Sequence, residues 1–480
     1  MNDFFFTLMM LVALSGDAGL PFWAHTGQYG RMPDASGALI LAQAQTQFDT
    51  SRDFQWRWGA GVATNGPSSG FVDQCYLSAR WKVFTLDVGM KHRDLDFVGA
   101  SPSLGSLSVT GGRLVESGNT RAMPGYRLYL APLTVPFTKE HLAVYGSFGD
   151  YKTLDTRYVE GALVHRMEAF VLARFGPHFE LHFGLDHYAL WGGGNMPITL
   201  DNYFRVITGR HASAEGSVSD QINVIGDHGG AEVIKLKWDE CDWSLTFQHD
   251  IPYSDKSGMR FNNFPDGVNT LHFGWKDKNR GVSDIVYELH YTRNQSGPLH
   301  EAETDADGNV IPWHPGMHIA GGDDYFNNGE YRSGWTYFGR PIGLPLCYPA
   351  GTRDGSWDPD LVVNGLENNR IRASHLGLGG KLFRRAPYRL MLTCCQCYGT
   401  FPIPYAGESA WGKEWGTVKE TPLVQFSAAF SGEIPGLFGL PWLQLAYGLY
   451  ADYGEVLPNQ FGALLGLKVV AGQSSRRVTR

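Results

Sequence analysis

Hydrophobic and polar residues alternate with a period of two in segment after segment of this chain. In DFQWRWGAGVAT (53–64), the rings of Phe54, Trp56 and Trp58 share one face, and Gln55 and Arg57 share the other. Successive side chains of a β-strand point to opposite sides, so this pattern predicts strands with one apolar and one polar face. The same pattern recurs at 37–48, 82–90, 241–249, 283–292, 388–398, 441–454 and 460–472.

The segments are roughly 8–12 residues long, which is the length that a tilted strand needs to cross an outer membrane. A soluble β-sandwich would show the same alternation, because one face of each of its sheets meets water. Trp and Tyr gather near the segment ends, as in the aromatic girdles of membrane barrels. We therefore expect an all-β protein, a transmembrane antiparallel β-barrel.

The N-terminus differs from the rest of the chain. Residues 4–14 form an uninterrupted apolar run, and small residues follow at 15–19. The run is too short for a transmembrane helix and suits the hydrophobic part of a secretory signal, although no Lys or Arg precedes it. We expect a signal peptide at 1–18 and a single barrel domain at 19–480. A buried N-terminal strand or helix is the alternative.

Composition narrows the function. The formal charge is −8, so no basic field attracts nucleic acid, and aromatic residues make up 13% of the chain, which argues against long disordered tracts. The CCQC run at 394–397 lies in an alternating segment, where Cys394 faces away from Cys395 and Cys397. We expect no metal site and no cofactor.

Two motifs that resemble functional sites are better explained as turns. GPSSG at 66–70 matches the nucleophile pattern of serine hydrolases, but strands flank it on both sides, so Ser68 is expected in a hairpin turn. DADGN at 305–309 has its glycine at the wrong position for a calcium loop. It falls within a long irregular interval at about 297–369, which we expect to be a large loop insertion with a functional role.

Several stretches together resemble the Wzi-like capsule-assembly proteins of the bacterial outer membrane, in the form found in Bacteroides-type bacteria. The resemblance implies a barrel of about 18 strands whose lumen is occluded by long loops and internal segments. It also implies a lectin-like role in holding capsular polysaccharide at the cell surface, without catalysis. The matching stretches are LPFWAHTGQYG (20–30), SGNTRAMPGY (117–126), GLDHYALWGG (184–193), GDHGG (226–230), SGMRFNNFPDG (257–267), YTRNQSG (291–297) and DYFNNGEYRSGWTYFGRPIGLP (324–345).

The last of these stretches supplies the main candidates for carbohydrate binding. Sugar rings pack their C–H faces on aromatic side chains, and sugar hydroxyls need fixed polar partners. The candidates are Asp323, Tyr325, Asn327, Asn328, Tyr331, Trp335, Tyr337 and Arg340. The same composition also suits a plug that packs its rings inside the barrel, so both readings stay open. A second loop offers Arg260, Asn262, Asn263 and Asp266, with Asp255 beside them.

The sequence thus predicts a non-enzymatic protein of the cell outer membrane, with capsular polysaccharide and outer-membrane lipid as its partners. A porin or sugar-conducting channel is the alternative and requires an open lumen. An outer-membrane enzyme is a third possibility, but no catalytic constellation stands out on one face. The oligomeric state is left open.

Overall fold

The computed structural model describes residues 3–16, 19–66, 69–194, 197–210, 224–254, 258–297, 321–353, 364–410, 413 and 417–473. Ser68, Asp255 and the 305–309 motif lie outside these residues. Among the described residues, no helix is long and apolar enough to cross a bilayer.

Strands dominate the fold. Eighteen of them form one large sheet: β1 (Phe4–Ser15), β2 (Gly37–Thr46), β3 (Phe54–Thr64), β4 (Gly70–Trp81), β5 (Phe84–Met90), β6 (Pro124–Thr134), β7 (Leu142–Lys152), β8 (Leu163–Phe175), β9 (Phe179–Trp191), β10 (Asp227–Asp239), β11 (Trp243–Tyr253), β12 (Gly267–Trp275), β13 (Asp284–Tyr291), β16 (Ile371–Leu382), β17 (Ala386–Cys397), β18 (Leu423–Pro435), β19 (Leu443–Gly454) and β20 (Gln460–Gln473). The shorter elements are β14 (Thr336–Tyr337) paired with β15 (Arg340–Pro341), helices α1 (Phe22–His25) and α2 (Leu200–Thr208), and 3-10 turns at Pro102–Leu104, Gly258–Arg260 and Leu437–Gly439.

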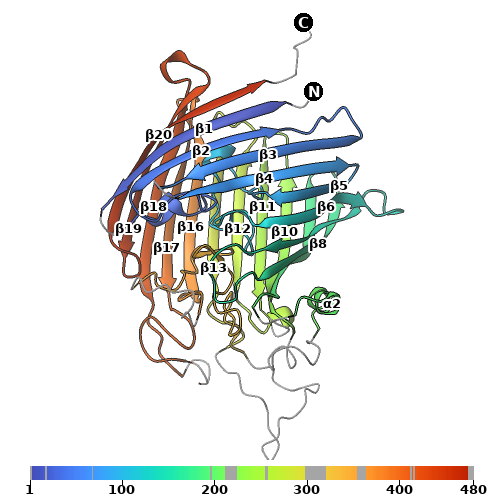
Figure 1. Cartoon of the computed structure of the whole chain (residues 1–480), viewed down its shortest axis with the longest axis vertical. Helices are drawn as coiled ribbons and strands as arrows, with labels where there is room; N and C mark the ends of the chain where they lie inside the picture. Colours follow the sequence, from blue (N-terminus) through green and yellow to red (C-terminus); the bar gives the residue numbers. More distant parts are fainter. Residues whose placement is uncertain are drawn as a thin grey trace, which may run out of the picture.

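Each strand of the large sheet pairs antiparallel with the next one along the chain, and β1 pairs with both β2 and β20. The sheet therefore closes on itself as an 18-stranded barrel (Figure 1). The expectation of a barrel with about 18 strands is confirmed.

The N-terminal apolar run lies in the barrel wall. Phe4–Ser15 is strand β1, with Leu8 opposite Ala42 on one side and Val469 on the other. The signal peptide at 1–18 stays a prediction, and the arrangement of these residues is that of the alternative, an N-terminal strand. Their inner face is apolar because Leu11 and Ala13 belong to a hydrophobic core inside the barrel, so the usual alternation is missing.

The predicted faces of the strands are found in the barrel wall. On β5, Leu86 and Val88 are exposed on the outside, while Thr85 and Asp87 are buried on the lumen side. On β3, Trp56 is likewise exposed on the outer surface. An apolar outer surface with a polar interior is the arrangement of a barrel surrounded by lipid.

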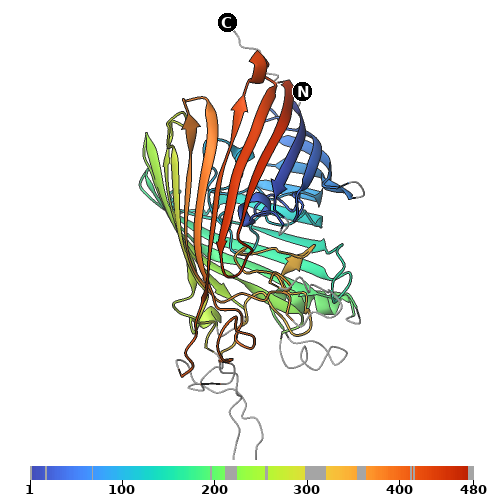
Figure 2. The ribbon, with the colours of Figure 1, turned by 90° about the vertical axis from the view of Figure 1, so that its left-hand side faces the viewer.

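The two ends of the barrel differ. The chain termini and the short turns, such as those at 82–83, 176–178 and 383–385, share one end (Figure 1). The long connections leave from the opposite end, which Figure 2 shows from the side. In outer-membrane barrels the short turns face the periplasm and the long loops face outward, so we refer to these as the periplasmic and outer ends.

Candidate functional site

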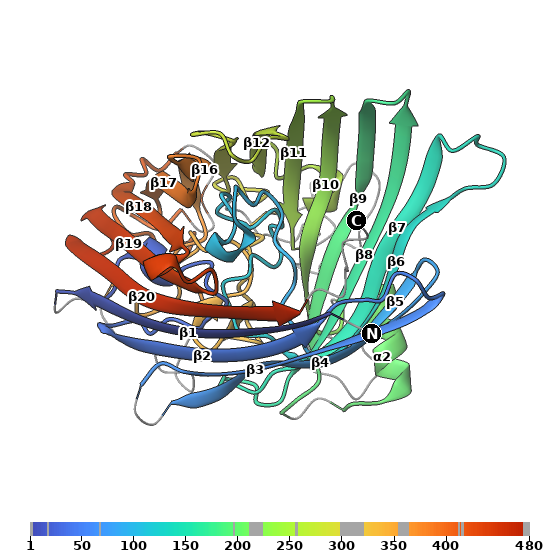
Figure 3. The same ribbon diagram turned by 90° about the horizontal axis from the view of Figure 1, so that it is seen from above.

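Two long connections turn inward and fill the lumen. One is the segment 91–123 between β5 and β6, and the other is 321–353 between β13 and β16. Figure 3, viewed along the barrel, shows both inside the ring of strands. We call these two segments together the plug.

The plug segments contact each other and the wall at Trp335. This side chain is fully buried, and its ring stacks on Tyr188 of β9 with ring centroids 3.9 Å apart and planes 13° apart. The indole N–H donates to the carbonyl of Val115 at 2.7 Å. Nearby, the backbone N–H of Ser117 donates to the carbonyl of Ile342 at 2.9 Å. One residue of the second segment thus joins the first segment to the barrel wall.

Glycines in the wall let the plug approach closely. A Cβ on Gly377 of β16 would lie 2.1 Å from the carbonyl oxygen of Leu107, and one on Gly379 would lie 3.1 Å from the Cα of Gly99. The first distance excludes a side chain at Gly377 unless the backbone shifts, and the second requires the neighbouring chain to give way by a few tenths of an ångström. In addition, His375 of β16 makes a 2.9 Å hydrogen bond to the carbonyl of Leu107. Glycines on β16 therefore leave the space that the backbone of the first plug segment occupies.

The rings of 323–343, for which the sequence analysis left a sugar surface and a plug both open, lie buried inside the barrel. Four of the candidates for sugar stacking have their faces covered by protein, because Tyr325, Tyr331, Trp335 and Tyr337 are all at most 3% exposed. Asn327 is buried as well and holds the chain through hydrogen bonds between its amide and the backbone of Leu366. These residues pack the plug, as the alternative reading of the segment predicted.

The polar candidates of the same segment also support the plug. Asp323 accepts a hydrogen bond from the hydroxyl of Ser296 at 2.9 Å, and Asn328 accepts bonds from the backbone N–H groups of Glu330 and Tyr331. Arg340 reaches the N-terminal region, where it donates to the carbonyl of Met32 at 3.1 Å and pairs with Asp34. Each of these side chains has a structural partner.

The second candidate loop, 258–266, divides into two halves. Asn263 and Asp266 are buried beneath it, where the hydroxyl of Tyr325 donates to Asp266 at 2.9 Å and the amide of Asn263 donates to that hydroxyl at 3.1 Å. Burial raises the pKa of Asp266 to about 7, although the backbone N–H groups of Gln295 and Asn294 and the Tyr325 hydroxyl favour its ionised form. These two candidates therefore bind the plug to the outer end of the barrel.

The other half of this loop faces outward. Arg260 and Asn262 are exposed, and two residues that the sequence analysis did not select stand beside them: Phe261 is 53% exposed and Phe264 is 77% exposed. The amide of Asn294 donates to the carbonyls of Asn262 and Phe264, which fixes the loop backbone. We call the exposed residues of 259–264 the rim loop. The alternation of apolar and polar residues could not identify Phe261 and Phe264, because the rim loop is neither a strand nor a regular helix.

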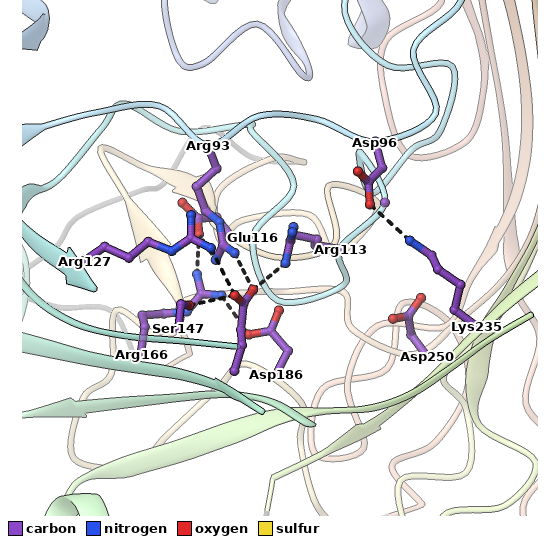
Figure 4. A network of polar contacts seen from close by, with 12 residues as sticks. Arg93, Asp96, Arg113, Glu116, Arg127, Ser147, Arg166, Asp186, Lys235 and Asp250 are labelled. Atoms are coloured by element: carbon purple, nitrogen blue, oxygen red, sulfur yellow. Dashed lines mark hydrogen bonds and ion pairs between the residues drawn. The ribbon is translucent and has the colours of Figure 1, made fainter. Parts of the chain in front are cut away.

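A network of charges joins the first plug segment to the wall on the β6–β9 side (Figure 4). Glu168 of β8 pairs with Arg93 and Arg113 of the plug, and it also accepts hydrogen bonds from Arg127 at 3.2 Å and Ser147 at 2.7 Å. Buried carboxylates of this kind are retained when several donors surround them. The sequence analysis did not find this network.

Glu116 extends the network from the plug side. It accepts a hydrogen bond from Arg93 at 2.8 Å and pairs with Arg166, which also contacts Asp186 at 2.8 Å (Figure 4). Burial opposes ionisation of Glu116, but the charges of Arg93 and Arg166 outweigh it and lower its pKa to about 2. The plug is thus held here by fixed charges that persist over the physiological pH range.

The cysteines have the predicted orientations. Cys395 and Cys397 are buried on the lumen side of β17 with their sulfur atoms 3.4 Å apart, while Cys394 lies on the other face. In the described part of the chain, no three His, Cys, Asp or Glu side chains converge on a position that would hold a metal ion.

Comparison with known proteins shows the fold. No family model and no curated protein matches the chain. Among solved structures, the chain is similar to Wzi of Escherichia coli, which is described as an outer-membrane, carbohydrate-binding β-barrel involved in group 1 capsule assembly. The two chains share 12% identity with a TM-score of 0.52, and the match covers 98% of this chain and 84% of that one. Two further matches are OccAB4 of Acinetobacter baumannii (9% identity, TM-score 0.45, 98% of each chain) and OccK3 of Pseudomonas aeruginosa (10%, 0.47, 98% of this chain and 96% of that one).

The lipid-facing surface, the closed sheet and the shared fold place this chain in the outer membrane.

Proposed function

We propose that this chain is a capsule-assembly protein that binds capsular polysaccharide at the cell surface through its rim loop and neighbouring outer surface, without catalysing a reaction. The single observation that carries the proposal is the exposed pair Phe261 and Phe264 above a lumen that the plug fills. The fold similarity to a carbohydrate-binding barrel of capsule assembly supports the same proposal.

The chemistry of the rim loop suits a sugar chain. Exposed aromatic rings are costly in water and pack well against the C–H faces of sugar rings. Arg260 and Asn262 alternate with the two rings, and they supply donors and an acceptor for hydroxyl groups. A guanidinium also binds carboxylate through two parallel hydrogen bonds, so Arg260 would favour an acidic sugar.

A channel is the competing function, and it requires a continuous aqueous path through the lumen. The plug residues argue against that path, because Trp335, Tyr337 and Ile342 are fully buried between the two segments and the wall. Binding at the outer surface needs no such path, and the rigid plug gives the rim loop a fixed support through Asp266 and Tyr325.

The test compares binding of the folded protein to the capsular polysaccharide of its own cell. The informative variant is Phe261→Ala with Phe264→Ala, and its matched control is Phe137→Ala with Phe383→Ala, two phenylalanines that are even more exposed and lie in periplasmic turns. We expect the rim variant to lose most of the binding while the control binds as the wild type does. A heat-modifiable gel shift confirms that each variant is a folded barrel.

Two outcomes would contradict the proposal. If the rim variant binds as well as the wild type, the sugar does not contact the rim loop. If the wild type itself does not bind, conductance in planar bilayers becomes the deciding measurement, and an open channel would favour the porin function.

A further inference from the structure

The connection between β9 and β10 follows a different course from the plug segments. Its helix α2 lies outside the barrel, near the outer end of the wall (Figure 1). There it packs on the outward side of the strands, where Val206 of the helix joins a buried cluster with Ala189 and Trp191 of β9. The helix thus occupies the position where lipid would otherwise contact the wall.

Polar groups beneath the helix fix its position. Asp150 of β7 points outward, and the hydroxyl of Tyr203 of α2 donates to it at 2.6 Å. Tyr126 of β6 also donates to this carboxylate, and His165 of β8 contacts it at 2.9 Å. A carboxylate on the outer wall would be costly to leave uncovered beside hydrocarbon. The helix covers it within a girdle of Tyr and Trp residues, which marks the membrane–water interface.

The helix has three distinct faces. Asn202 and Val206 face the wall and are buried, and Asp201 with Arg205 forms an ion pair of 2.7 Å on a polar face. The remaining face carries Leu200, 77% exposed, and Phe204, 62% exposed, one helical turn apart. Ile198, just before the helix, is also exposed on the outside. The side chains of Leu200 and Phe204 share one helical face and stay largely exposed, although the ring of Phe204 also contacts that of Tyr203 with centroids 6.1 Å apart.

The groove between helix and wall continues this apolar surface. It has a volume of about 410 Å³ and opens outward, and its walls include Leu163, Ile198 and Leu200. On β6, Leu128 lies two residues beyond the groove residue Tyr126 and is exposed on the same outer face. The apolar face of α2 is therefore continuous with the surface that contacts lipid.

We propose that α2 is an interfacial helix of the outer leaflet, with Leu200 and Phe204 inserted among the lipid acyl chains. An amphipathic helix with one apolar and one charged face lies in the plane of the interface in this way. The helix then widens the contact between barrel and membrane on one side only, below the loops of the outer end. It would set the depth and tilt at which the rim loop is presented.

The test places nitroxide labels on the helix. Single cysteines replace Leu200, Phe204 or, as the matched control, Asp201, in a background where the accessible Cys75, Cys241 and Cys394 are substituted. The protein is reconstituted into vesicles of phosphatidylethanolamine and phosphatidylglycerol. We expect labels at 200 and 204 to collide more with oxygen than with a water-soluble nickel complex, and the label at 201 to show the reverse order.

Equal access of nickel to all three labels would overturn the proposal, because the helix would then lie in water. A second measurement does not depend on the cysteine background. Native tryptophans such as Trp56 also face lipid, so the readout is the emission added over that of the wild type. The emission added by Phe204→Trp should be quenched by lipids with brominated acyl chains, whereas the emission added by Asp201→Trp should not. Added emission at position 204 that is insensitive to bromine would also contradict insertion.

Discussion

Replacing Trp335 with alanine tests whether the plug is held by the contact that we identify as its centre. The change removes a fully buried ring from between Tyr188 and the first plug segment, and it leaves the carbonyl of Val115 without its donor. The barrel wall keeps its own hydrogen bonds in this variant. The expected effect is therefore local: the second plug segment loses its attachment while the barrel remains closed.

The free-energy cost of Trp335→Ala follows from the burial of the ring. Truncation of a buried tryptophan to alanine costs about 3–5 kcal/mol, which includes the transfer of the ring to water and the cavity left behind. The full transfer cost applies here, because an opened lumen fills with water and not with lipid. The orphaned carbonyl adds to the loss, by about 1–3 kcal/mol if it stays buried. At about 1.4 kcal/mol per factor of ten, the ring alone shifts the closed–open equilibrium by roughly 100-fold to several thousand-fold.

Two assays report this opening. The wild type should show no steady conductance in planar bilayers, and Trp335→Ala should show intermittent openings. Cys347 of the same plug segment offers a chemical readout, because burial raises the pKa of its thiol and the thiol is inaccessible. A maleimide should therefore label Cys347 in the variant but not in the wild type, and peptide mapping separates this label from those on the other cysteines.

Phe338→Ala is the matched control, because Phe338 lies in the same segment and is 42% exposed. We expect this variant to stay closed. The reasoning is refuted if Trp335→Ala stays closed, keeps Cys347 unreactive and resists heat as the wild type does. The plug would then be held by other contacts, and the stacking on Tyr188 would contribute little.

Three further predictions address other contacts of the plug. Glu168→Gln removes the negative charge shared by Arg93, Arg113 and Arg127 and replaces one acceptor oxygen with an NH2 donor. We expect this variant to lose about 3–5 kcal/mol and to show a lower temperature of heat modification, whereas Glu180→Gln at the partly exposed lumen wall should change little. Equal temperatures for both variants would count against the network. Burial raises the folded-state pKa of Asp266 to about 7, so its contribution to the stability of the folded protein is fully present below about pH 4 and declines as the pH rises to about 7. Asp266→Asn should flatten this part of the profile of thermal midpoint against pH. An unchanged slope would contradict the assignment. Gly377→Val places a side chain where the carbonyl of Leu107 lies, so limited proteolysis should cut the chain within residues 97–107. The control Gly281→Val adds a side chain at an open position and should leave this segment protected. Protection in Gly377→Val as well would show that the wall can move aside.

The barrel could be predicted from the sequence because each strand shows its two faces in the order of its own neighbouring residues. The contrast between Leu86 and Asp87 on β5 follows from strict alternation, and each strand repeats it independently. Strand β1 escaped this reasoning because both of its faces are apolar, one toward lipid and one toward the core around Leu11. An apolar run of that length has the same appearance in a signal peptide and in such a strand.

The candidate site could be predicted only in part. The composition of 323–343 is equally suited to a sugar surface and to a packed plug, and the burial of Trp335 depends on Tyr188, which lies 147 positions earlier in the chain. The charge network has the same property, because Arg93 and Glu168 are separated by 75 positions. The strand pattern carries no information about which loop residues meet across a lumen.

The closure of the barrel by β1 and β20 has a consequence for biogenesis. Segment 91–123 is synthesised early, but its partners Glu288, His375 and Ile342 come much later in the chain. Once β1 and β20 pair, the wall is continuous, so the interior segment must already be enclosed or must enter from one end. Such long-range contacts form slowly, because the intervening chain loses much entropy when they close. We expect the final seam between the first and last strands to be the slow, committing step of assembly in the membrane.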